Sequence, residues 1–537
     1  MNRKIQKQLA LFMALAVLVA GLVYTPKVQE GQVKAAQRGT FKNLNQAEIT
    51  AAMGAGWNVG NQLEAVINGE PKEDGWQSTL ITKELLAKVK EQGFTSVRIP
   101  ISYLTKIGAA PSYTIDEAWL ARIQEVVDWC MELDLYAIIN MHGDGYNSVD
   151  GGWLLCNAPE KEQPQIKAKY EACWKQIATR FADYDEHLIF ESMNEEFDGT
   201  YVGDPNKEYY ANINAYNQIF VDTVRQTGSN NAKRWLLIPG WNTEPDYTAG
   251  TLNDDGTYKE YGFALPTDTH LSAEVPAGEK RIMISVHYYK PWDFCGDENK
   301  DYASRFGTDA NIKRSGSLGG YGDEAYMDKS FKILHDRFVA QGYPVVIGEY
   351  GSIDKSVSDE NNIKYRAYYA NLVCYNSKQY GLIPVYWDNG YNGNNGFALF
   401  DRATITVTQQ SIIDAIMAVY QSPTPTKYDA PVVDASTDYF KDAIYLGPVS
   451  SKKSGQMKLE WEYISYVDGY QLVIATNKKF TKNKKTFNIN NYVQDTKTIK
   501  NLKKGKKYYA KIRAFTKVNK KKRYSKWSNI DYAKIKK

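Results

Sequence analysis

The chain has 537 residues, more than a single domain usually holds, so a large unit followed by a smaller module is expected. Apolar residues make up 43% and charged residues 24% of the sequence, a balance that excludes a wholly disordered chain. The net charge of +4 conceals two unlike parts, because from Gly447 onward about 25 Lys and Arg stand against 5 Asp and Glu. This change in charge predicts a domain boundary.

The N-terminus has the pattern of a secretory signal peptide. Basic residues at positions 3, 4 and 7 precede an apolar run at 9–23, and small residues follow at 35 and 36. A membrane anchor is the alternative, but the run is shorter than the ~20 residues that a span needs. We therefore expect residues 1–36 to be a signal peptide and the protein to be secreted and extracellular, with cell-wall association as a further expectation.

Eight short apolar runs of β character lie between residues 40 and 420. Near-continuous apolar runs are typical of parallel strands that are buried on both faces. The runs are GWNVGN (56–61), SVRIPIS (96–102), YAIINMH (136–142), LIFESMNE (188–195), WLLIPGWN (235–242), IMISVHYY (282–289), VVIGEYG (345–351) and IPVYWDN (383–389).

The stretches between these runs are long enough to hold helices. Apolar residues recur at helical spacing from Trp119 to Met131, after Asp116, and from Leu85 to Val89, before Gly93. A strand followed by a helix, repeated eight times, predicts an α/β fold of the (β/α)8 TIM barrel type over residues 40–420. A doubly wound open sheet is the alternative, but no G-x-G-x-x-G loop follows any strand.

Nearly every predicted strand ends in a polar or aromatic residue. The carboxyl ends of barrel strands form one shared cleft, so these side chains are expected to converge there. They are Arg98, His142, Asn194, Glu195, Trp241, His287, Tyr289, Glu349 and Trp387.

Two of these residues are carboxylic acids on different strands, Glu195 and Glu349. Glycoside hydrolysis requires one protonated carboxyl group and one ionised one. Glu195 follows an apolar strand, where partial burial would keep its proton available, whereas a neighbouring cation and phenol would hold Glu349 ionised. The pair therefore points to hydrolysis of a glycosidic bond.

The motifs GWNVGN, VRIPISY, INMH, FESMNE, VHYY, VIGEYG and the strand around Trp387 occur in the order seen in glycoside hydrolase family 5, and residues 45–420 resemble its endo-β-1,4-glucanase type. The resemblance implies that Glu195 is the acid/base and Glu349 the nucleophile, with Arg98 and Tyr289 bonded to Glu349. It further implies substrate contacts by Asn194, His142 and His287, a stacking floor at Trp387, and a sugar contact at Asn61.

The chain departs from the family pattern at two positions: Gly143 follows His142, and Glu196 stands where the family often has Pro. Both change the cleft wall and leave the preferred glycan open. The expected substrate is a β-1,4-linked glucan, either cellulose or mixed-linkage β-glucan, with mannan, xyloglucan or xylan as alternatives. Trp153, Trp241 and Trp292 are candidates for further sugar subsites.

Neither a metal nor another cofactor is expected, because neither strand-end histidine belongs to an H-E-x-x-H pattern. A non-catalytic glycan-binding protein is a competing reading that the two glutamates oppose. An esterase would need a G-x-S-x-G elbow, which the sequence lacks.

The C-terminal part alternates polar and apolar residues in short segments. We expect a linker at 421–445 and a small all-β module at 446–537, which resembles a fibronectin type III domain around Trp461, GYQLVIAT and YYAKIRAF. Its basic surface favours contact with anionic cell-wall polymers, and no nucleic-acid motif accompanies the charge. The protein is expected to be a monomer.

Overall fold

The structure is a computed structural model that describes residues 40–145, 151–307, 314–317, 321–432, 440–464, 466–518 and 520–537. The expected signal peptide and residues 433–439 of the expected linker lie outside the described residues. Within the described part of the chain, no helix is both long enough and apolar enough to cross a bilayer.

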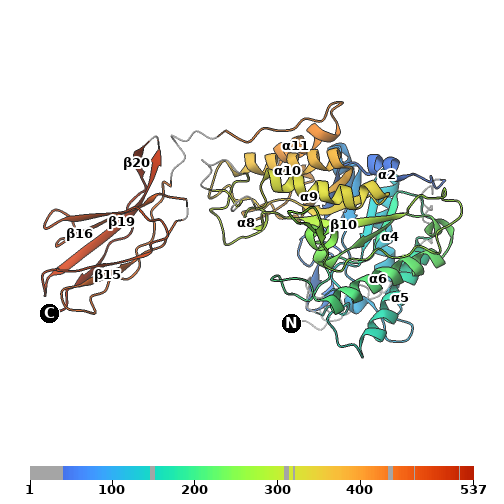
Figure 1. Ribbon diagram of the computed structural model, residues 1–537, viewed down its shortest axis with the longest axis horizontal. Coiled ribbons are helices and arrows are strands. Elements are labelled where there is room, and N and C mark those ends of the chain that lie inside the picture. The colour runs from blue at the N-terminus through green and yellow to red at the C-terminus, as the bar shows by residue number, and fades with distance from the viewer. Residues whose placement is uncertain are drawn as a thin grey trace, which may run out of the picture. The chain divides into compact units, whose positions relative to one another are not determined.

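Eight parallel strands close into a barrel, which confirms the predicted (β/α)8 fold (Figure 1). Closure joins the first and last strands in register, with Gly56 opposite Val385. Every strand lies at one of the predicted apolar runs. In chain order they are β1 (Gly56–Val59), β4 (Ser96–Ile99), β5 (Tyr136–Asn140), β6 (Leu188–Glu191), β7 (Leu236–Pro239), β10 (Ile282–Tyr288), β11 (Val345–Tyr350) and β12 (Leu382–Asp388).

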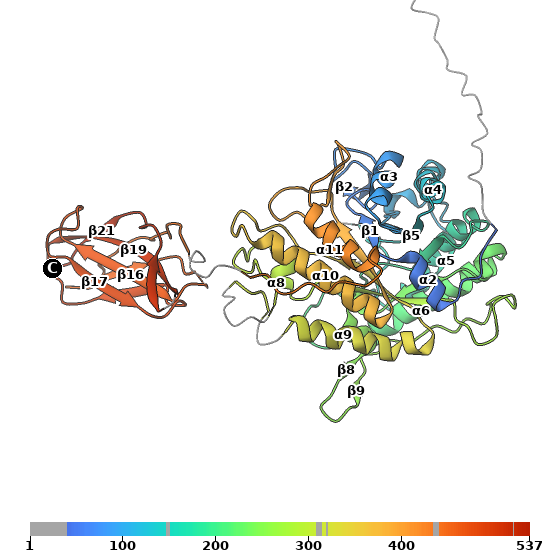
Figure 2. The same ribbon diagram turned by 90° about the horizontal axis from the view of Figure 1, so that it is seen from above.

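A ring of helices surrounds the barrel (Figure 2). The side chain of Asp116 caps the N-terminus of the helix predicted after it, and Thr82 caps the preceding one, because each side chain accepts a hydrogen bond from a backbone N–H of the first turn. The helices are α3 (Lys83–Glu91), α4 (Glu117–Glu132), α5 (Gln163–Arg180), α6 (Lys207–Gln226), α7 (Pro245–Ala249), α8 (Trp292–Cys295), α9 (Glu324–Arg337), α10 (Asn362–Tyr380) and α11 (Gln410–Tyr420).

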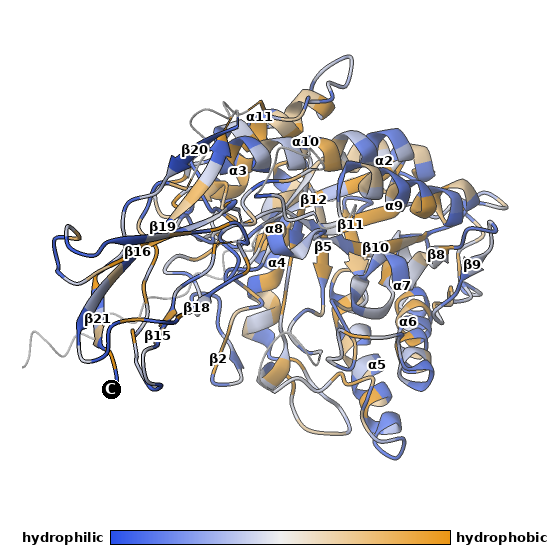
Figure 3. Cartoon of the chain, turned by 60° about the vertical axis from the view of Figure 1, so that its left-hand side comes forward, coloured by the Kyte–Doolittle hydropathy of each residue, from blue (hydrophilic) through white to orange (hydrophobic). Residues whose placement is uncertain are grey.

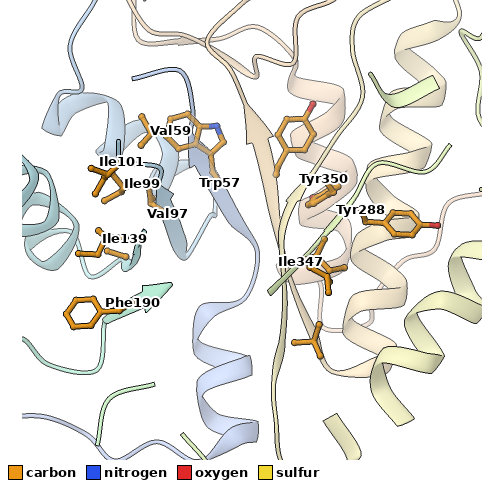
Figure 4. Packing of buried hydrophobic residues seen from close by; sticks show 14 of the residues in the cluster. Trp57, Val59, Val97, Ile99, Ile101, Ile139, Phe190, Tyr288, Ile347 and Tyr350 are labelled. Atoms are coloured by element: carbon orange, nitrogen blue, oxygen red, sulfur yellow. The ribbon is translucent and has the colours of Figure 1, made fainter. Parts of the chain in front are cut away.

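The barrel strands are buried on both faces, as their apolar sequences predict. Val97, Ile99 and Ile139 from neighbouring strands belong to the large core between the strands and the helices (Figure 4). A second core lies inside the barrel, where Ile49 and Met53 of α2 (Gln46–Met53) pack with side chains of the strands, Ile138 and Leu237 among them. α2 therefore closes one end of the barrel, and the strand ends at the other end remain available for a site.

The five cysteines are buried and free, which is typical of thiols that pack as small apolar groups. None of them is held in a disulfide, so the fold rests on packing, hydrogen bonds and buried ion pairs.

The C-terminal residues form β-sheets with a core of their own, which includes Trp461, Leu472 and Ile512. One sheet pairs β15 with β18, and the other has the order β17-β16-β19-β20 with β21 also paired to β19. Hydrophilic residues colour much of β20 and β21, in contrast to the hydrophobic barrel strand β5 (Figure 3). The strands are β15 (Met457–Glu460), β16 (Gly469–Ala475), β17 (Lys485–Ile489), β18 (Thr496–Ile499), β19 (Lys507–Val518), β20 (Lys521–Tyr524) and β21 (Asp531–Lys534).

Candidate active site

Glu195 and Glu349 face one another at the carboxyl ends of the barrel strands. Glu349 is the penultimate residue of β11, and Glu195 lies four residues after the end of β6. One carboxylate oxygen of each and one ring nitrogen of His287 all lie within 4.8 Å of one another. The fold thus brings together two carboxyl groups that are 154 positions apart in the chain.

Glu349 is buried and receives hydrogen bonds from two neighbours. The Nη1 of Arg98 donates to its Oε1 at 2.8 Å, and the hydroxyl of Tyr289 donates to its Oε2 at 3.1 Å. Burial raises the pKa of the Glu349 carboxyl, whereas His287 and Arg98 oppose the rise. The cation and the phenol that the sequence predicted beside Glu349 both contact its carboxyl group. The sequence did not predict the desolvation that opposes them.

Glu195 is more open to solvent, with a side chain that is 34% exposed. Its Oε1 lies 2.7 Å from Nδ1 of His287, and the same nitrogen lies 3.5 Å from Oε2 of Glu349. His287 therefore stands between the two carboxyl groups. Gly348 gives the ring its space, since a Cβ at this position would come within 3.2 Å of Nε2.

Arg98 is completely buried beneath the cleft and orients several side chains. Besides Glu349, its guanidinium donates to Oδ1 of Asn194 at 2.8 Å, to Oδ1 of Asn58 at 3.0 Å and to Oε2 of Glu191 at 2.7 Å. Because the amide oxygen of Asn194 is held by Arg98, the NH₂ group of Asn194 is the end available to a ligand.

His142 is held neutral beside this cation. Burial lowers its pKa well below the usual value, and Arg98 and His287 lower it further. The imidazole stacks on the indole of Trp387, with ring centroids 6.1 Å apart and planes 10° apart. These two rings make one wall of the cleft.

Most of the predicted residues line one pocket. It contains Asn61, His142, Asn194, Glu195, Tyr289, Glu349 and Trp387, while Arg98 and His287 are buried behind it. Trp292, one of the candidate subsite residues, also lines it and is 55% exposed.

Two other candidate tryptophans are placed elsewhere. Trp241 is 2% exposed, packs against Phe197 and Tyr210, and lines a neighbouring pocket. Trp153 donates its indole N–H to Asp144 and lies under the ammonium group of Lys169. Both indoles are thus held by packing or hydrogen bonds within the fold, and neither lines the pocket of the two glutamates.

Sequence reasoning missed several residues of the site. Glu64 and Trp76 line the same pocket, and Asn58 and Glu191 lie in the hydrogen-bond network beneath it. Glu191 belongs to the motif FESMNE, but the alternation of side chains along a strand does not reveal which polar residue faces the barrel interior. Trp76 lies in a long loop, where no periodic signal exists.

Two groups of described side chains bring metal-ligand atoms within 4.8 Å of one another. One is Glu195, His287 and Glu349, where Glu349 already forms an ion pair with Arg98, whose positive charge disfavours a second cation. The other is Asp185, Glu186 and His187, in which His187 is bonded to Asp185. We assign a metal function to neither group.

Comparison with known proteins agrees with this geometry. The family model described as "Cellulase (glycosyl hydrolase family 5)" matches residues 57–393. Endoglucanase A of Paenibacillus barcinonensis is 55% identical over 382 residues, which cover 71% of this chain and 92% of the relative.

Solved structures show the same similarity. A family 5 xyloglucanase from Paenibacillus pabuli, in complex with ligand, is 57% identical with a TM-score of 0.65, and the match covers 69% of this chain and 99% of that one. A GH5-4 broad specificity endoglucanase from Bacteroides salanitronis is 37% identical with a TM-score of 0.62, covering 71% and 98%.

Proposed function

The chain belongs to glycosyl hydrolase family 5, and on that premise we propose that it is a retaining endo-β-1,4-glucanase with Glu195 as acid/base and Glu349 as nucleophile. The observation that carries the proposal is the separation of the two carboxyl groups, whose nearest oxygens lie within 4.8 Å. Retaining enzymes hold these groups about 5–5.5 Å apart, whereas inverting enzymes leave about 6.5–9.5 Å for a water molecule.

The hydrogen bonds around the pair suit a double displacement. An oxygen of Glu349 attacks the anomeric carbon, while Glu195 gives its proton to the departing glycosidic oxygen. Glu195 then takes a proton from water, whose oxygen displaces Glu349 and releases the sugar with its configuration retained. Arg98 and Tyr289 stabilise the charge on Glu349 before the attack and after its release.

The remaining cleft residues fit a pyranose ring. Trp387 offers an aromatic face on which a sugar can stack, and neutral His142 and the amide of Asn194 offer hydrogen-bonding groups to its hydroxyls. Trp76 and Trp292, 41% and 55% exposed, extend this lining.

The substrate that we propose is a β-1,4-linked glucan. Xyloglucan is the second candidate, favoured by the 57% identity with a structure titled as a family 5 xyloglucanase. Reducing-sugar release from carboxymethylcellulose, barley β-glucan, xyloglucan and glucomannan, measured in parallel, separates the two. Cleavage of glucomannan alone would refute both candidates.

The roles of the glutamates are tested by alanine variants on activated aryl cellobiosides. Glu349→Ala loses the attacking oxygen, so turnover should collapse on every substrate. Glu195→Ala should still form the glycosyl-enzyme from an aryl glycoside, because that leaving group needs little protonation, while polymer hydrolysis fails. Circular dichroism verifies the fold of both variants, because Glu349→Ala also removes one partner of the buried Arg98.

Added azide makes the two variants distinguishable by product stereochemistry, read by NMR. In Glu195→Ala, azide attacks the covalent intermediate and gives a glycosyl azide of retained configuration. In Glu349→Ala, azide attacks the substrate directly and gives the inverted product. The opposite pair of outcomes would show that the two roles are exchanged.

We propose that residues 446–537 form a fibronectin type III-like sandwich and that 421–445 are the linker before it. Support comes from the sheet orders, β15-β18 and β17-β16-β19-β20 with β21 beside β19. The bridges Leu446 to Trp461 and Ser450 to Lys458 add an edge segment to the first sheet. Two antiparallel sheets of this size are the architecture of that domain type.

For this module we propose contact with an anionic cell-wall polymer. Nζ of Lys511 and Cζ of Arg513, on the outer side of β19, lie 4.2 and 4.3 Å from the ring centroid of Trp527. Nζ of Lys507 lies 3.9 Å from the ring centroid of Tyr532. Cations cover these aromatic faces, so the surface offers positive charge rather than open rings for a neutral glucan. Such a role fits a secreted protein, which is the location that we propose from the N-terminal sequence.

A further inference from the structure

Glu191 is a third carboxyl group at the base of the cleft, and the reaction described above does not use it. It is the last residue of β6, and its side chain is completely buried, with no exposed surface. An ionised carboxyl group in such a place is costly unless it is paired and hydrogen-bonded.

Each oxygen of Glu191 has partners from other strands. Oε2 accepts a bond from Nε of Arg98 at 2.7 Å and one from Nδ2 of Asn140 at 3.1 Å, and Oε1 accepts one from the hydroxyl of Ser285 at 2.6 Å. These partners come from β4, β5 and β10, so the carboxylate ties three strands to β6.

The division of the Arg98 donors connects Glu191 to the site. Nε is bonded to Glu191, while Nη1 and Nη2 are bonded to Glu349 and Asn194. Because the guanidinium is planar and rigid, anchoring its Nε edge determines where the two Nη groups point.

The positive charge of Arg98 is also divided between Glu191 and Glu349. One buried cation, Arg98, serves two buried carboxylates, and the other titratable groups that face this cluster are His142, Glu195, His287 and Tyr289. A negative charge on Glu191 therefore takes up part of the stabilisation that Arg98 would otherwise give to ionised Glu349.

We propose that Glu191 is a positioning residue that holds Arg98 by its Nε edge and shares its charge, so that Glu349 and Asn194 are oriented and the ionisation of the nucleophile is tuned. The inference rests on the proposed function of Glu349. It assigns a role to a residue that contacts no substrate.

The test is Glu191→Gln in the full chain. Glutamine keeps the shape: its Oε1 can accept from Arg98 and Asn140, and its NH₂ can donate to Ser285, whose hydroxyl is able to accept. Removing the charge leaves Arg98 to Glu349 alone, which favours the ionised nucleophile. The acid limb of the kcat/KM profile should therefore move to lower pH, by about 0.5 unit or more.

Glu73→Gln is the matched control, because Glu73 is also a buried carboxylate bonded to an arginine, Arg122, and it lies outside the cleft lining. This variant should leave the acid limb where it is. An unchanged acid limb in folded Glu191→Gln, with folding verified by circular dichroism, would overturn the charge-sharing role.

Trapping with a 2-deoxy-2-fluoro cellobioside carrying an activated leaving group separates this inference from the proposed function. Its rate of inactivation follows the ionised nucleophile, and peptide mapping identifies the labelled residue. A label on any residue other than Glu349 would refute the proposed function. A label on Glu349 whose pH dependence is the same in wild type and Glu191→Gln would refute the inference alone.

Should Glu191→Gln fail to fold, Ser285→Ala carries the test. It removes one bond from Glu191 and keeps the charge, so the acid limb should stay in place while kcat falls about five-fold, as for the loss of roughly 1 kcal/mol of positioning. An unaltered kcat would show that the anchoring of Glu191 has no effect on the reaction.

Discussion

The glutamates of this cleft have different roles because their burial and their hydrogen-bond partners differ. Glu195 is one third exposed, Glu349 is buried beside Arg98, and Glu191 is enclosed below both. Glu64, which lines the same pocket, accepts hydrogen bonds from the backbone N–H groups of Asn61 and Gln62. The four glutamates therefore differ in burial and in hydrogen-bond partners, although they are of one residue type.

Glu64 leads to a prediction about stability. Burial raises its pKa to about 7, partly offset by the N–H groups of Asn61 and Gln62. Between about pH 4.5 and pH 7, Glu64 is therefore protonated in the native state but ionised in the unfolded state. Stability should fall as pH rises through this window, by up to about 3 kcal/mol.

Glu64→Gln removes this titration, so its free energy of unfolding should change less between pH 5 and pH 8 than that of wild type. Urea unfolding at the two pH values measures the difference. The control is Glu70→Gln, at an exposed residue of the hairpin formed by β2 (Val66–Ile67) and β3 (Glu70–Pro71), and it should behave like wild type. Equal pH dependence in wild type and Glu64→Gln would contradict the prediction.

At the scale of elements, the barrel is closed by β1 and β12, and the side chain of Asp388 links this seam to the loop that carries Arg402. Asp388 ends β12 and is completely buried. Its Oδ2 accepts from the indole of Trp57 in β1 at 3.0 Å, and its Oδ1 pairs with Arg402 at 3.0 Å. Arg402 also donates to the backbone oxygen of Gly60, directly after β1. The buried ion pair of Asp388 and Arg402 therefore reinforces the backbone pairing of β1 with β12.

Asp388→Asn should destabilise the barrel by about 3–5 kcal/mol, because it leaves the charge of Arg402 buried without its partner. An amide also offers one oxygen where two are now used, since backbone N–H groups of Gly390 and Leu399 bond to the carboxylate as well. Chemical unfolding gives the value. The control is Asp414→Asn on the exposed face of α11, which should change the free energy of unfolding by about 0.5 kcal/mol or less. A loss of only about 0.5 kcal/mol in Asp388→Asn would contradict the proposed role of the ion pair in stabilising the barrel.

For the whole molecule, charge and chemistry are divided between the two parts of the chain. The residues that line the cleft all lie between positions 61 and 397. The C-terminal sheets have a separate core and carry about 25 Lys and Arg against 5 Asp and Glu after Gly447. Catalysis and the basic surface are therefore expected to be separable.

Deleting residues 446–537 should leave kcat/KM on a soluble β-glucan within about two-fold of the full chain, since the deleted part supplies no cleft residue. Binding to an anionic polymer, such as polygalacturonate in a pull-down at low salt, should be lost. The full chain in high salt serves as the control for charge-dependent binding. Loss of hydrolysis in a truncated protein that still unfolds cooperatively would mean that the boundary is misplaced.

The sequence alone determined the barrel and much of the site. Buried parallel strands need near-continuous apolar runs, and helices between them need apolar residues at helical spacing, so both are visible in a single chain. Since the carboxyl ends of barrel strands meet, the polar residues that end those runs, such as Glu195 and Glu349, were predictable as one cluster.

The tertiary structure alone decided which side chains contact one another, which are desolvated and which line the cleft. Trp241 and Trp292 both follow strands, yet one is buried and the other lines the cleft, because loop packing depends on contacts between distant segments. Glu191 and Glu64 were missed for the same reason. The direction in which the pKa of Glu349 shifts depends on desolvation, and desolvation is set by every neighbour that excludes water, which only the folded chain brings together.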